Sequence, residues 1–365
     1  MSTAQPAGAQ QRVETEPLLS VRNIVQEYVS RGPGNVKAGV VHAVSDISFD
    51  LPRGQTLGIV GETGSGKSTL ARAIIQVERP KSGEVVFRGQ DIAALPKRKL
   101  TKVHAQMQMV YQDPFGSLNP RWRVEDVVAE PLLGHTKQNR AQRRARVREL
   151  LELVGLKPDT YLRRRPTELS GGQAQRVAIA RAIALNPALI ICDEAISSLD
   201  VLIQAQVLNL FEKLRVELGL SYLFIAHDLA TVKQISDQVA VMHLGQLAEI
   251  GPAQEIYRAP RHPYTRALLD SIPGLDPQTG IARRPVTLKG EPPSPLNPPS
   301  GCRFRTRCPR AQDLCAEVMP PLTEHDPGHF AACHFPLEAP AVISSESLVA
   351  SIRRTGPAAE PINRR

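Results

Sequence analysis

A glycine-rich segment at residues 61–68 contains residue types that together can bind phosphate. It reads Gly61, Glu62, Thr63, Gly64, Ser65, Gly66, Lys67 and Ser68, and Thr69 comes next. The order matches the pattern G-x-x-x-x-G-K-[ST], in which backbone N–H groups surround phosphates, the lysine reaches the β- and γ-phosphates, and the hydroxyl binds Mg²⁺. An incidental glycine-rich turn is the alternative interpretation. We predict an ATP site here, with Lys67 on the phosphates and Ser68 on Mg²⁺.

Two adjacent carboxylates, Asp193 and Glu194, end the apolar run at residues 189–192. A carboxylate so placed can hold the water shell of Mg²⁺, and a second one can polarise the water that attacks the γ-phosphate. Two acids at the end of a buried strand could instead cap the next helix. Because a phosphate-binding pattern occurs in the same chain, we predict that Asp193 contacts Mg²⁺ and that Glu194 activates water.

Two further polar residues follow apolar runs of the same kind. Gln112 comes after residues 107–111, and His227 comes after residues 222–226. A lone glutamine or histidine is usually a surface or core residue, so only their position at strand ends favours a role. We predict that Gln112 reaches Mg²⁺ or the attacking water and that His227 contacts the γ-phosphate.

A short segment at residues 169–173 reads Leu169, Ser170, Gly171, Gly172 and Gln173. Alone it predicts only the start of a helix, with a serine N-cap before small residues. Its order in the chain adds more information. It follows the glycine-rich segment by about a hundred residues and precedes the two carboxylates by about twenty.

The elements that must position these residues alternate between strands and helices. We predict strands at 56–60, 107–111, 188–192 and 222–226, helices from 67 and over 202–218, and mostly helix over 120–185. This alternation is typical of an α/β fold with a parallel sheet, in which ligands bind at the carboxyl ends of the strands.

The composition narrows the class of protein. The chain has 365 residues, a net charge of +9 and only 4% aromatic residues. Few aromatics disfavour a stacking surface for single-stranded nucleic acid, whereas the positive charge suits nucleic acid and anionic lipid equally. The sequence shows neither an apolar run of about 18 residues nor a signal-peptide pattern, so we expect a cytosolic or peripheral protein. The basic residues of 139–154 are interpreted as a solvated helix face.

Taken together, these motifs resemble the ATP-binding subunits of ABC transporters. The matching parts are the Walker A loop (61–68), the Q-loop (112–114), the signature (169–173), Walker B (189–194), the D-loop with Asp200 (198–200) and the switch histidine His227. The resemblance implies a P-loop NTPase fold with an N-terminal β subdomain, a helical subdomain and ATP hydrolysis. Tyr28 resembles the aromatic residue that stacks on adenine, although it could equally be a core residue. Ala195 and Ile196 depart from the Pro-Thr that such ATPases often have.

Three further segments resemble the dipeptide, oligopeptide and nickel importer subgroup, namely residues 107–121, 200–207 and 262–269. Residues 200–207 favour the second of the two ATPase subunits that such importers usually carry. The resemblance implies a heterodimer with the other ATPase subunit, two transmembrane permeases and, indirectly, an extracytoplasmic solute-binding protein. It places the chain at the cytoplasmic face of the membrane and implies no nucleic acid. We expect an ATPase domain (18–255, helical part about 115–185) and a C-terminal extension (256–336). The polar residues 1–17 and the Pro/Ala/Ser-rich residues 337–365 predict a disordered lead-in and a disordered tail.

The family arrangement also implies that two ATPase domains pack head to tail. Ser170, Gly171, Gly172 and Gln173 would then contact the ATP held by the partner subunit, and ATP would drive closure of the dimer. A soluble ABC ATPase that acts on nucleic acid or ribosomes is the alternative function.

Four of the five cysteines lie in the Pro-rich C-terminal part: Cys302, Cys308, Cys315 and Cys333. In a reducing compartment such a group favours metal binding over disulfides. The spacings are longer than those of most zinc sites, and four thiolates also suit a [4Fe–4S] cluster. Free thiols without metal are the simplest alternative. The resemblance to the importer family favours iron–sulfur over zinc.

Overall fold

The computed structural model describes residues 16–31, 37–272, 274–275, 282–283, 290–291 and 293–338. The lead-in and tail that we predicted to be disordered lie outside the described residues, apart from the inner two residues of each.

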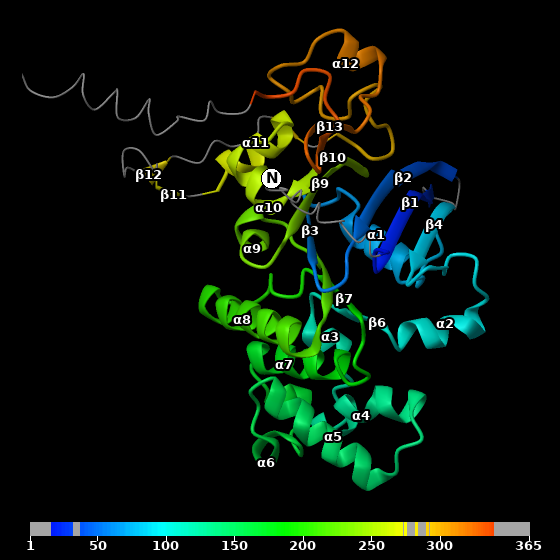
Figure 1. Cartoon of the computed structure of the whole chain (residues 1–365), viewed down its shortest axis with the longest axis vertical. Coiled ribbons are helices and arrows are strands. Elements are labelled where there is room, and N and C mark those ends of the chain that lie inside the picture. The colour runs from blue at the N-terminus through cyan, green and yellow to red at the C-terminus, as the bar shows by residue number, and fades with distance from the viewer. Residues whose placement is uncertain are drawn as a thin grey trace, which may run out of the picture.

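A large mixed sheet forms the centre of the molecule (Figure 1). Within the described residues it has eight strands, in the order β13–β14–β10–β9–β3–β8–β7–β6. Their bounds are β13 (Thr323–Asp326), β14 (His329–Ala331), β10 (Gln246–Pro252), β9 (Gln238–His243), β3 (Thr56–Val60), β8 (Ser221–Ile225), β7 (Leu189–Asp193) and β6 (Met107–Val110). The strands from β9 to β6 are parallel, and β10, β14 and β13 continue the sheet by antiparallel pairing. The parallel sheet predicted from the sequence is confirmed.

A smaller antiparallel sheet lies beside the large one (Figure 1). Its order is β2–β1–β4–β5, and a two-stranded β11–β12 pair also occurs. The bounds are β1 (Leu19–Arg31), β2 (Lys37–Leu51), β4 (Ser82–Phe87), β5 (Gln90–Asp91), β11 (Gly274–Leu275) and β12 (Ala282–Arg283).

Helices cover the sheets and form the lower end of the molecule in Figure 1. They are α1 (Lys67–Ile74), α2 (Lys97–His104), α3 (Pro114–Ser117), α4 (Val124–His135), α5 (Arg140–Leu153), α6 (Pro158–Tyr161), α7 (Gly171–Ala182), α8 (Val201–Leu218), α9 (Leu229–Lys233), α10 (Ala253–Arg258), α11 (Pro263–Asp270) and α12 (Leu314–Glu317). The helix predicted over 202–218 is α8. Asp200 caps it by accepting from the Ile203 N–H at 3.0 Å, and Gly219 ends it with φ 64°.

The core lies on both faces of the large sheet, because successive side chains of a strand point to opposite sides. In β7, Leu189 and Ile191 join the apolar cluster on the side of α1 and the small sheet. Ile190 and Cys192 join the cluster on the side of α7 and α8. All of β7 is therefore buried, which agrees with the continuous apolar run in the sequence.

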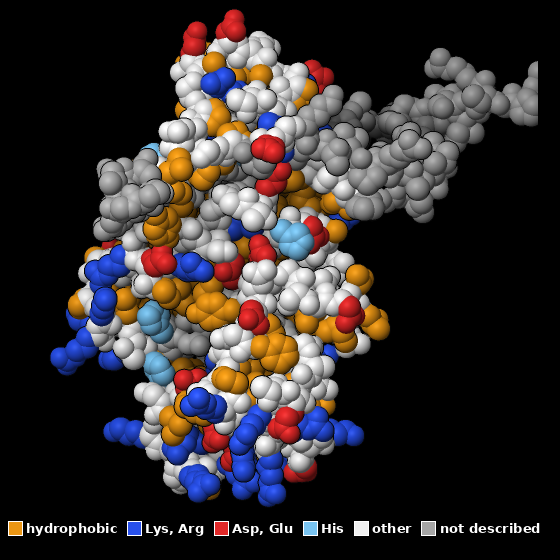
Figure 2. Space-filling model, turned by 180° about the vertical axis from the view of Figure 1, so that it is seen from behind, with side chains coloured by type: hydrophobic (Ala, Val, Ile, Leu, Met, Phe, Trp, Pro, Cys, Tyr) orange, Lys and Arg blue, Asp and Glu red, His pale blue; other side chains and the backbone are white. Residues whose placement is uncertain are grey.

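Lys and Arg side chains gather at the lower end of the molecule, where α4–α6 lie (Figure 2). Three arginines of α5 are ion-paired there: Arg144 with Glu125, Arg146 with Glu149, and Arg148 with Asp159. Val147, Leu150 and Leu151 of the same helix are buried. The prediction of a solvated basic face on an amphipathic helix is confirmed.

The C-terminal extension is less irregular than its proline content predicts. Its strands β13 and β14 join the edge of the large sheet, where Glu249 and Ile250 of β10 pair with Ala331 and Phe330 of β14. The extension is thus built onto the ATPase domain by main-chain hydrogen bonds.

Candidate ATP-binding and hydrolysis site

Four neighbouring parallel strands bring the predicted site residues to one edge of the sheet. The strands β3, β8, β7 and β6 are adjacent and parallel, so their carboxyl ends meet there. The glycine-rich loop follows β3, His227 follows β8, the two carboxylates end β7, and Gln112 follows β6. The convergence predicted from the strand ends is confirmed at the level of the backbone.

The glycine-rich loop closes tightly before α1. Gly66 has φ 101°, and a Cβ atom there would lie 2.0 Å from the Ala43 carbonyl oxygen, so only glycine fits. Helix α1 has no side-chain cap. Its first N–H groups are therefore available to an anionic ligand, and the helix dipole favours negative charge at this end.

Lys67 lies inside this loop and is buried. Its ammonium donates to the carbonyl oxygens of Gly61 at 2.7 Å and Glu62 at 3.1 Å. Burial lowers the pKa of Lys67, and the charges of Glu194 and Asp193 act against this shift. The ammonium thus lies beside the groups that we predict to bind phosphate and Mg²⁺.

Ser68 and Asp193 meet across the site, with Ser68 Oγ donating to Asp193 Oδ1 at 2.7 Å. Burial raises the pKa of Asp193, the nearby Glu194 adds to this effect, and the Ser68 hydrogen bond opposes it. A hydroxyl and a carboxylate at this spacing are the oxygen ligands that Mg²⁺ prefers. The pair therefore fits the magnesium site predicted from the sequence.

Glu194 adopts an unusual backbone conformation at the end of β7, with φ 50°. Its N–H donates to the Ile225 carbonyl of β8 at 3.0 Å, which keeps the turn against the sheet. Strained residues of this kind are common at active sites. Ala195 and Ile196, the departure from the Pro-Thr pattern, are both buried in the core.

His227 and Glu194 line the same pocket, whose other walls include Ser197, Gln204 and Thr231. The His227 side chain is exposed. Gln112 is also exposed, and its carbonyl accepts from the Ser198 hydroxyl at 3.3 Å, so the Q-loop contacts the D-loop. The contacts of these side chains with phosphate or metal stay predictions.

The signature segment starts α7 as predicted. Ser170 and Gln173 form a capping box: the Ser170 hydroxyl accepts from the Gln173 N–H, and the Gln173 side chain accepts from the Ser170 N–H. Ser170 is exposed. Helix α7 packs against α4 and α5, and it lies apart from α1 in Figure 1. The signature is therefore open to a second molecule rather than closed over this chain's own loop.

Tyr28 lies in β1, and its hydroxyl donates to Glu78. Burial raises its pKa, and the hydrogen bond with Glu78 adds to the shift, whereas one with Thr69 opposes it. The ring is thus close to the first turn of α1, as an adenine-stacking role requires, and that role stays a prediction.

Cys302, Cys308, Cys315 and Cys333 are free thiols that line one cavity. Burial raises the pKa of the Cys302, Cys308 and Cys333 thiols, and the neighbouring cysteines add to the shift. Among the described residues, no group of three or more Cys, His, Asp or Glu side chains is arranged to hold a metal ion. The predicted metal site, whether iron–sulfur or zinc, is therefore not supported by the described residues.

Two family models match this chain. The ABC transporter model matches residues 44–197, and the model of the oligopeptide/dipeptide transporter C-terminal region matches residues 248–315. The oligopeptide transport ATP-binding protein AppF of Bacillus subtilis (strain 168) is 49% identical over 321 residues, which cover 87% of this chain and 97% of that protein. The chain belongs to the ABC transporter ATP-binding subunits. It is an ATPase of the branch that carries the oligopeptide/dipeptide C-terminal region.

Other similar proteins agree with this membership. A putative peptide import ATP-binding protein of Brucella ovis is 46% identical over 317 residues, covering 87% of this chain and 97% of that protein. The ATP-binding cassette MJ0796, solved as a dimer in a post-hydrolysis state with ADP and Pi, has a TM-score of 0.58 and 27% identity. The match covers 64% of this chain and 98% of MJ0796. The structure of cbiO1 from Clostridium perfringens also has a TM-score of 0.58, with 26% identity, covering 66% of this chain and 90% of cbiO1.

In the described part of the chain, the structure has no helix long and apolar enough to cross a bilayer.

Residues of the extension also reach the site, and sequence reasoning missed their role. Tyr264 and Arg307 both contact Glu62 of the phosphate-binding loop. Glu62 and Arg307 are 245 positions apart, so no local pattern in the sequence could have paired them.

Proposed function

We propose that this chain is the energy-coupling subunit of an importer for peptides or related solutes. It would pair with a second ATPase subunit and act on two permeases at the cytoplasmic face of the membrane, with an extracytoplasmic protein that delivers the solute. The names of the relatives support the peptide class. The intact site supports hydrolysis by this subunit rather than a purely structural role.

The observation that carries this proposal is the position of Glu194. Glu194 directly follows Asp193, the proposed metal ligand, and it lines one pocket with His227. A carboxylate there can orient water for in-line attack on a γ-phosphate, while Lys67 and the loop N–H groups stabilise the charge of the transferred phosphoryl group. Mg²⁺ held by Ser68, Asp193 and Gln112 would supply further stabilisation of the same charge.

The open signature segment supports a composite site. The exposed Ser170 hydroxyl and the N-terminus of α7, including Gly171 and Gly172, would bind the γ-phosphate of ATP on the partner subunit. ATP would then join the two subunits, hydrolysis would separate them, and Asp200 would contribute to the contact between the two sites. The motion would pass to the permeases through the segment from Gln112 to about residue 130.

We also propose that the four cysteines of the extension bind a [4Fe–4S] cluster. Each thiolate of such a cluster binds its own iron, so the four sulfurs must border one cavity rather than converge on one point. The four thiols border one cavity and none forms a disulfide, which supports this proposal. The cluster would hold the extension together. An absorbance band near 400 nm that dithionite bleaches would support it, whereas protein with bound zinc and no such band would contradict it.

Transport by the reconstituted complex tests the main proposal. The chain would be purified with its permeases and second ATPase subunit, placed in liposomes, and supplied with binding protein and labelled peptides. We expect ATP-dependent uptake. With Glu194→Gln in place, ATP binding should persist and hydrolysis should fall by about a hundredfold or more, because general-base catalysis is lost. ATP hydrolysis without co-purifying membrane proteins, stimulated instead by nucleic acid or ribosomes, would contradict the proposal.

A further inference from the structure

The C-terminal extension binds the side chain of Glu62 in the phosphate-binding loop. Arg307 donates from Nη1 to Glu62 Oε2 at 2.6 Å and from Nη2 to Oε1 at 2.9 Å. This bidentate geometry is the strongest form of an arginine–carboxylate pair. The Arg307 side chain is only 4% exposed and that of Glu62 is 25% exposed, so solvent screens the pair poorly.

The main chain of Glu62 is held as well. Its N–H donates to the Tyr264 hydroxyl at 3.0 Å, and its carbonyl accepts from the Lys67 ammonium at 3.1 Å. One residue of the loop therefore joins two residues of the extension to the lysine that binds phosphate. A shift of Glu62 would move the carbonyl that Lys67 contacts.

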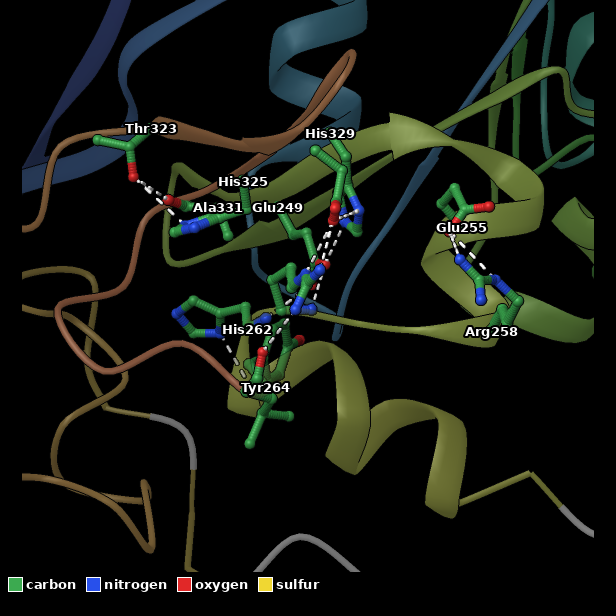
Figure 3. A network of polar contacts seen from close by, with 12 residues as sticks. Glu249, Glu255, Arg258, His262, Tyr264, Thr323, His325, His329 and Ala331 are labelled. Atoms are coloured by element: carbon green, nitrogen blue, oxygen red, sulfur yellow. Dashed lines mark hydrogen bonds and ion pairs between the residues drawn. The ribbon is translucent and has the colours of Figure 1, made fainter. Parts of the chain in front are cut away.

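Tyr264 is fixed by the polar network shown in Figure 3. The buried Glu249 accepts from the His262 N–H at 3.0 Å and from His329 Nε2 at 2.6 Å. His262 Nδ1 in turn accepts from the Tyr264 N–H at 3.0 Å. The Tyr264 ring is fully buried against Phe304, with the ring centroids 5.2 Å apart. The tyrosine thus has little freedom to follow a moving loop.

Arg307 is fixed by the segment that contains three of the cysteines, residues 301–315, which we call the cysteine segment. The Arg307 N–H donates to the Phe304 carbonyl at 3.0 Å, and the Cys302 N–H donates to the Cys315 carbonyl at 2.8 Å. Cys308, the next residue, lines the cavity shared by the four thiols. The main-chain position of Arg307 therefore depends on how this segment is folded.

The charge of Arg307 is the main electrostatic partner of Glu62. Burial acts to raise the pKa of Glu62, but the hydrogen bonds and charge of Arg307 outweigh it, so the pKa is lowered overall. His243 Nδ1 also lies 3.9 Å from the carboxylate. However, burial lowers the pKa of His243 to about 4, so this histidine is neutral near pH 7. Arg307 is thus the cation that offsets the burial of this carboxylate.

We propose that Arg307 is a positioning residue through which the cysteine segment sets the affinity of the phosphate-binding loop for ATP. A well-ordered cysteine segment keeps Arg307 on Glu62, and Glu62 then keeps the loop and Lys67 in the phosphate-binding arrangement. When the segment loosens, the carboxylate turns to solvent and the loop follows. The inference concerns ATP binding by the chain itself, so it does not depend on which solute is transported.

The test measures ATP affinity of the full chain by titration calorimetry with Mg²⁺-ATP, alongside the rate at saturating ATP. Arg307→Ala should raise the dissociation constant about tenfold, because it leaves a partly buried carboxylate unpaired. The turnover rate at saturating ATP should change by less than about twofold, since Arg307 does not touch the reacting atoms. Arg307→Lys should recover part of the affinity, because a lysine keeps the charge without the bidentate geometry.

Arg305→Ala is the matched control. Arg305 lies in the same segment and donates to Ser300 rather than to the loop. We expect the ATP affinity of the Arg305→Ala variant to stay within about twofold of that of the unmodified chain. Equal loss in both arginine variants would show a general folding defect and overturn the proposal.

Two further variants test the coupling and keep the test valid if Arg307→Ala folds poorly. Glu62→Gln should weaken ATP binding to a similar degree, and the double variant with Arg307→Ala should be no weaker than either single one. Cys308→Ser should also weaken binding, but it should add nothing in the Arg307→Ala background. Unchanged affinity in Arg307→Ala, additive effects of Glu62→Gln and Arg307→Ala, or unchanged affinity in Cys308→Ser would each overturn the proposal.

Discussion

The Ser68 hydroxyl of the phosphate-binding loop and the Asp193 carboxylate of β7 lie 2.7 Å apart. They come from elements that are 125 positions apart in the chain. Burial raises the pKa of Asp193, so the ionised carboxylate is costly in this position without a cation. A divalent ion would offset that cost, which makes the pair a sensitive probe of the metal.

Asp193→Asn should remove most of the Mg²⁺ dependence of the site. The amide keeps the size of the side chain but loses the negative charge that a hard dication requires. In the absence of Mg²⁺, the variant and the unmodified chain should bind ATP with the same affinity. Hydrolysis in the presence of Mg²⁺ should fall by about a hundredfold or more in the variant. Asp159→Asn, in an exposed ion pair with Arg148, serves as the control. Normal Mg²⁺-dependent hydrolysis in Asp193→Asn would show that another group holds the metal.

Ser170→Asp should damage the partner's ATP site while sparing the ATP site of this chain. Aspartate caps a helix about as well as serine or asparagine does, so α7 should keep its start. Its negative charge would repel the γ-phosphate, and we expect hydrolysis by the assembled complex to fall about tenfold or more. The control is Ser170→Asn, which caps equally well without the charge. Labelling of each subunit with a photoreactive ATP analogue distinguishes the two sites. Loss of labelling on the altered subunit alone would contradict a site shared between subunits.

Tyr28 tests whether the ring near α1 stacks on adenine. Tyr28→Phe keeps the ring and loses the hydrogen bond to Glu78, so ATP affinity should change by less than about twofold. Tyr28→Ala should weaken ATP by about tenfold, because stacking of a base on an aromatic ring contributes about 1–3 kcal/mol. Competition between ATP and inorganic triphosphate measures the contribution of the base. Equal affinity in Tyr28→Ala and Tyr28→Phe would assign the ring to packing instead.

Acid should destabilise the join between the extension and the ATPase domain. Burial lowers the pKa of His262 from 6.5 to about 4. The unfolded chain therefore binds a proton that the folded chain excludes, and the free energy of unfolding should fall as pH drops from about 6.5 toward 4. The effect of this one residue is on the order of a few kcal/mol.

Urea unfolding at a series of pH values measures this slope. His262→Asn should flatten it, because asparagine keeps an acceptor for the Tyr264 N–H without a titrating ring. His135→Asn, on an exposed residue at the end of α4, should leave the slope unchanged. The same slope in His262→Asn and the unmodified chain would show that other groups control the acid transition.

The local features of the site were predictable from the sequence alone. Each of three features depends on residues a few positions apart: the phosphate-binding loop, the start of α7 at Ser170, and the two carboxylates at the end of β7. Short spacings specify backbone geometry directly, since a loop or a capping box is formed within one stretch of chain. The alternation of strands and helices likewise predicted that the carboxyl ends of the parallel strands lie at one edge of the sheet.

Only the tertiary structure decided which distant residues share a contact. The pairing of Glu62 with Arg307, the joining of β14 to β10, and the meeting of four cysteines at one cavity all link parts of the chain that no short pattern connects. Arg307 in the sequence is one of many arginines. Its contact with Glu62 forms because the folded extension lies against the phosphate-binding loop.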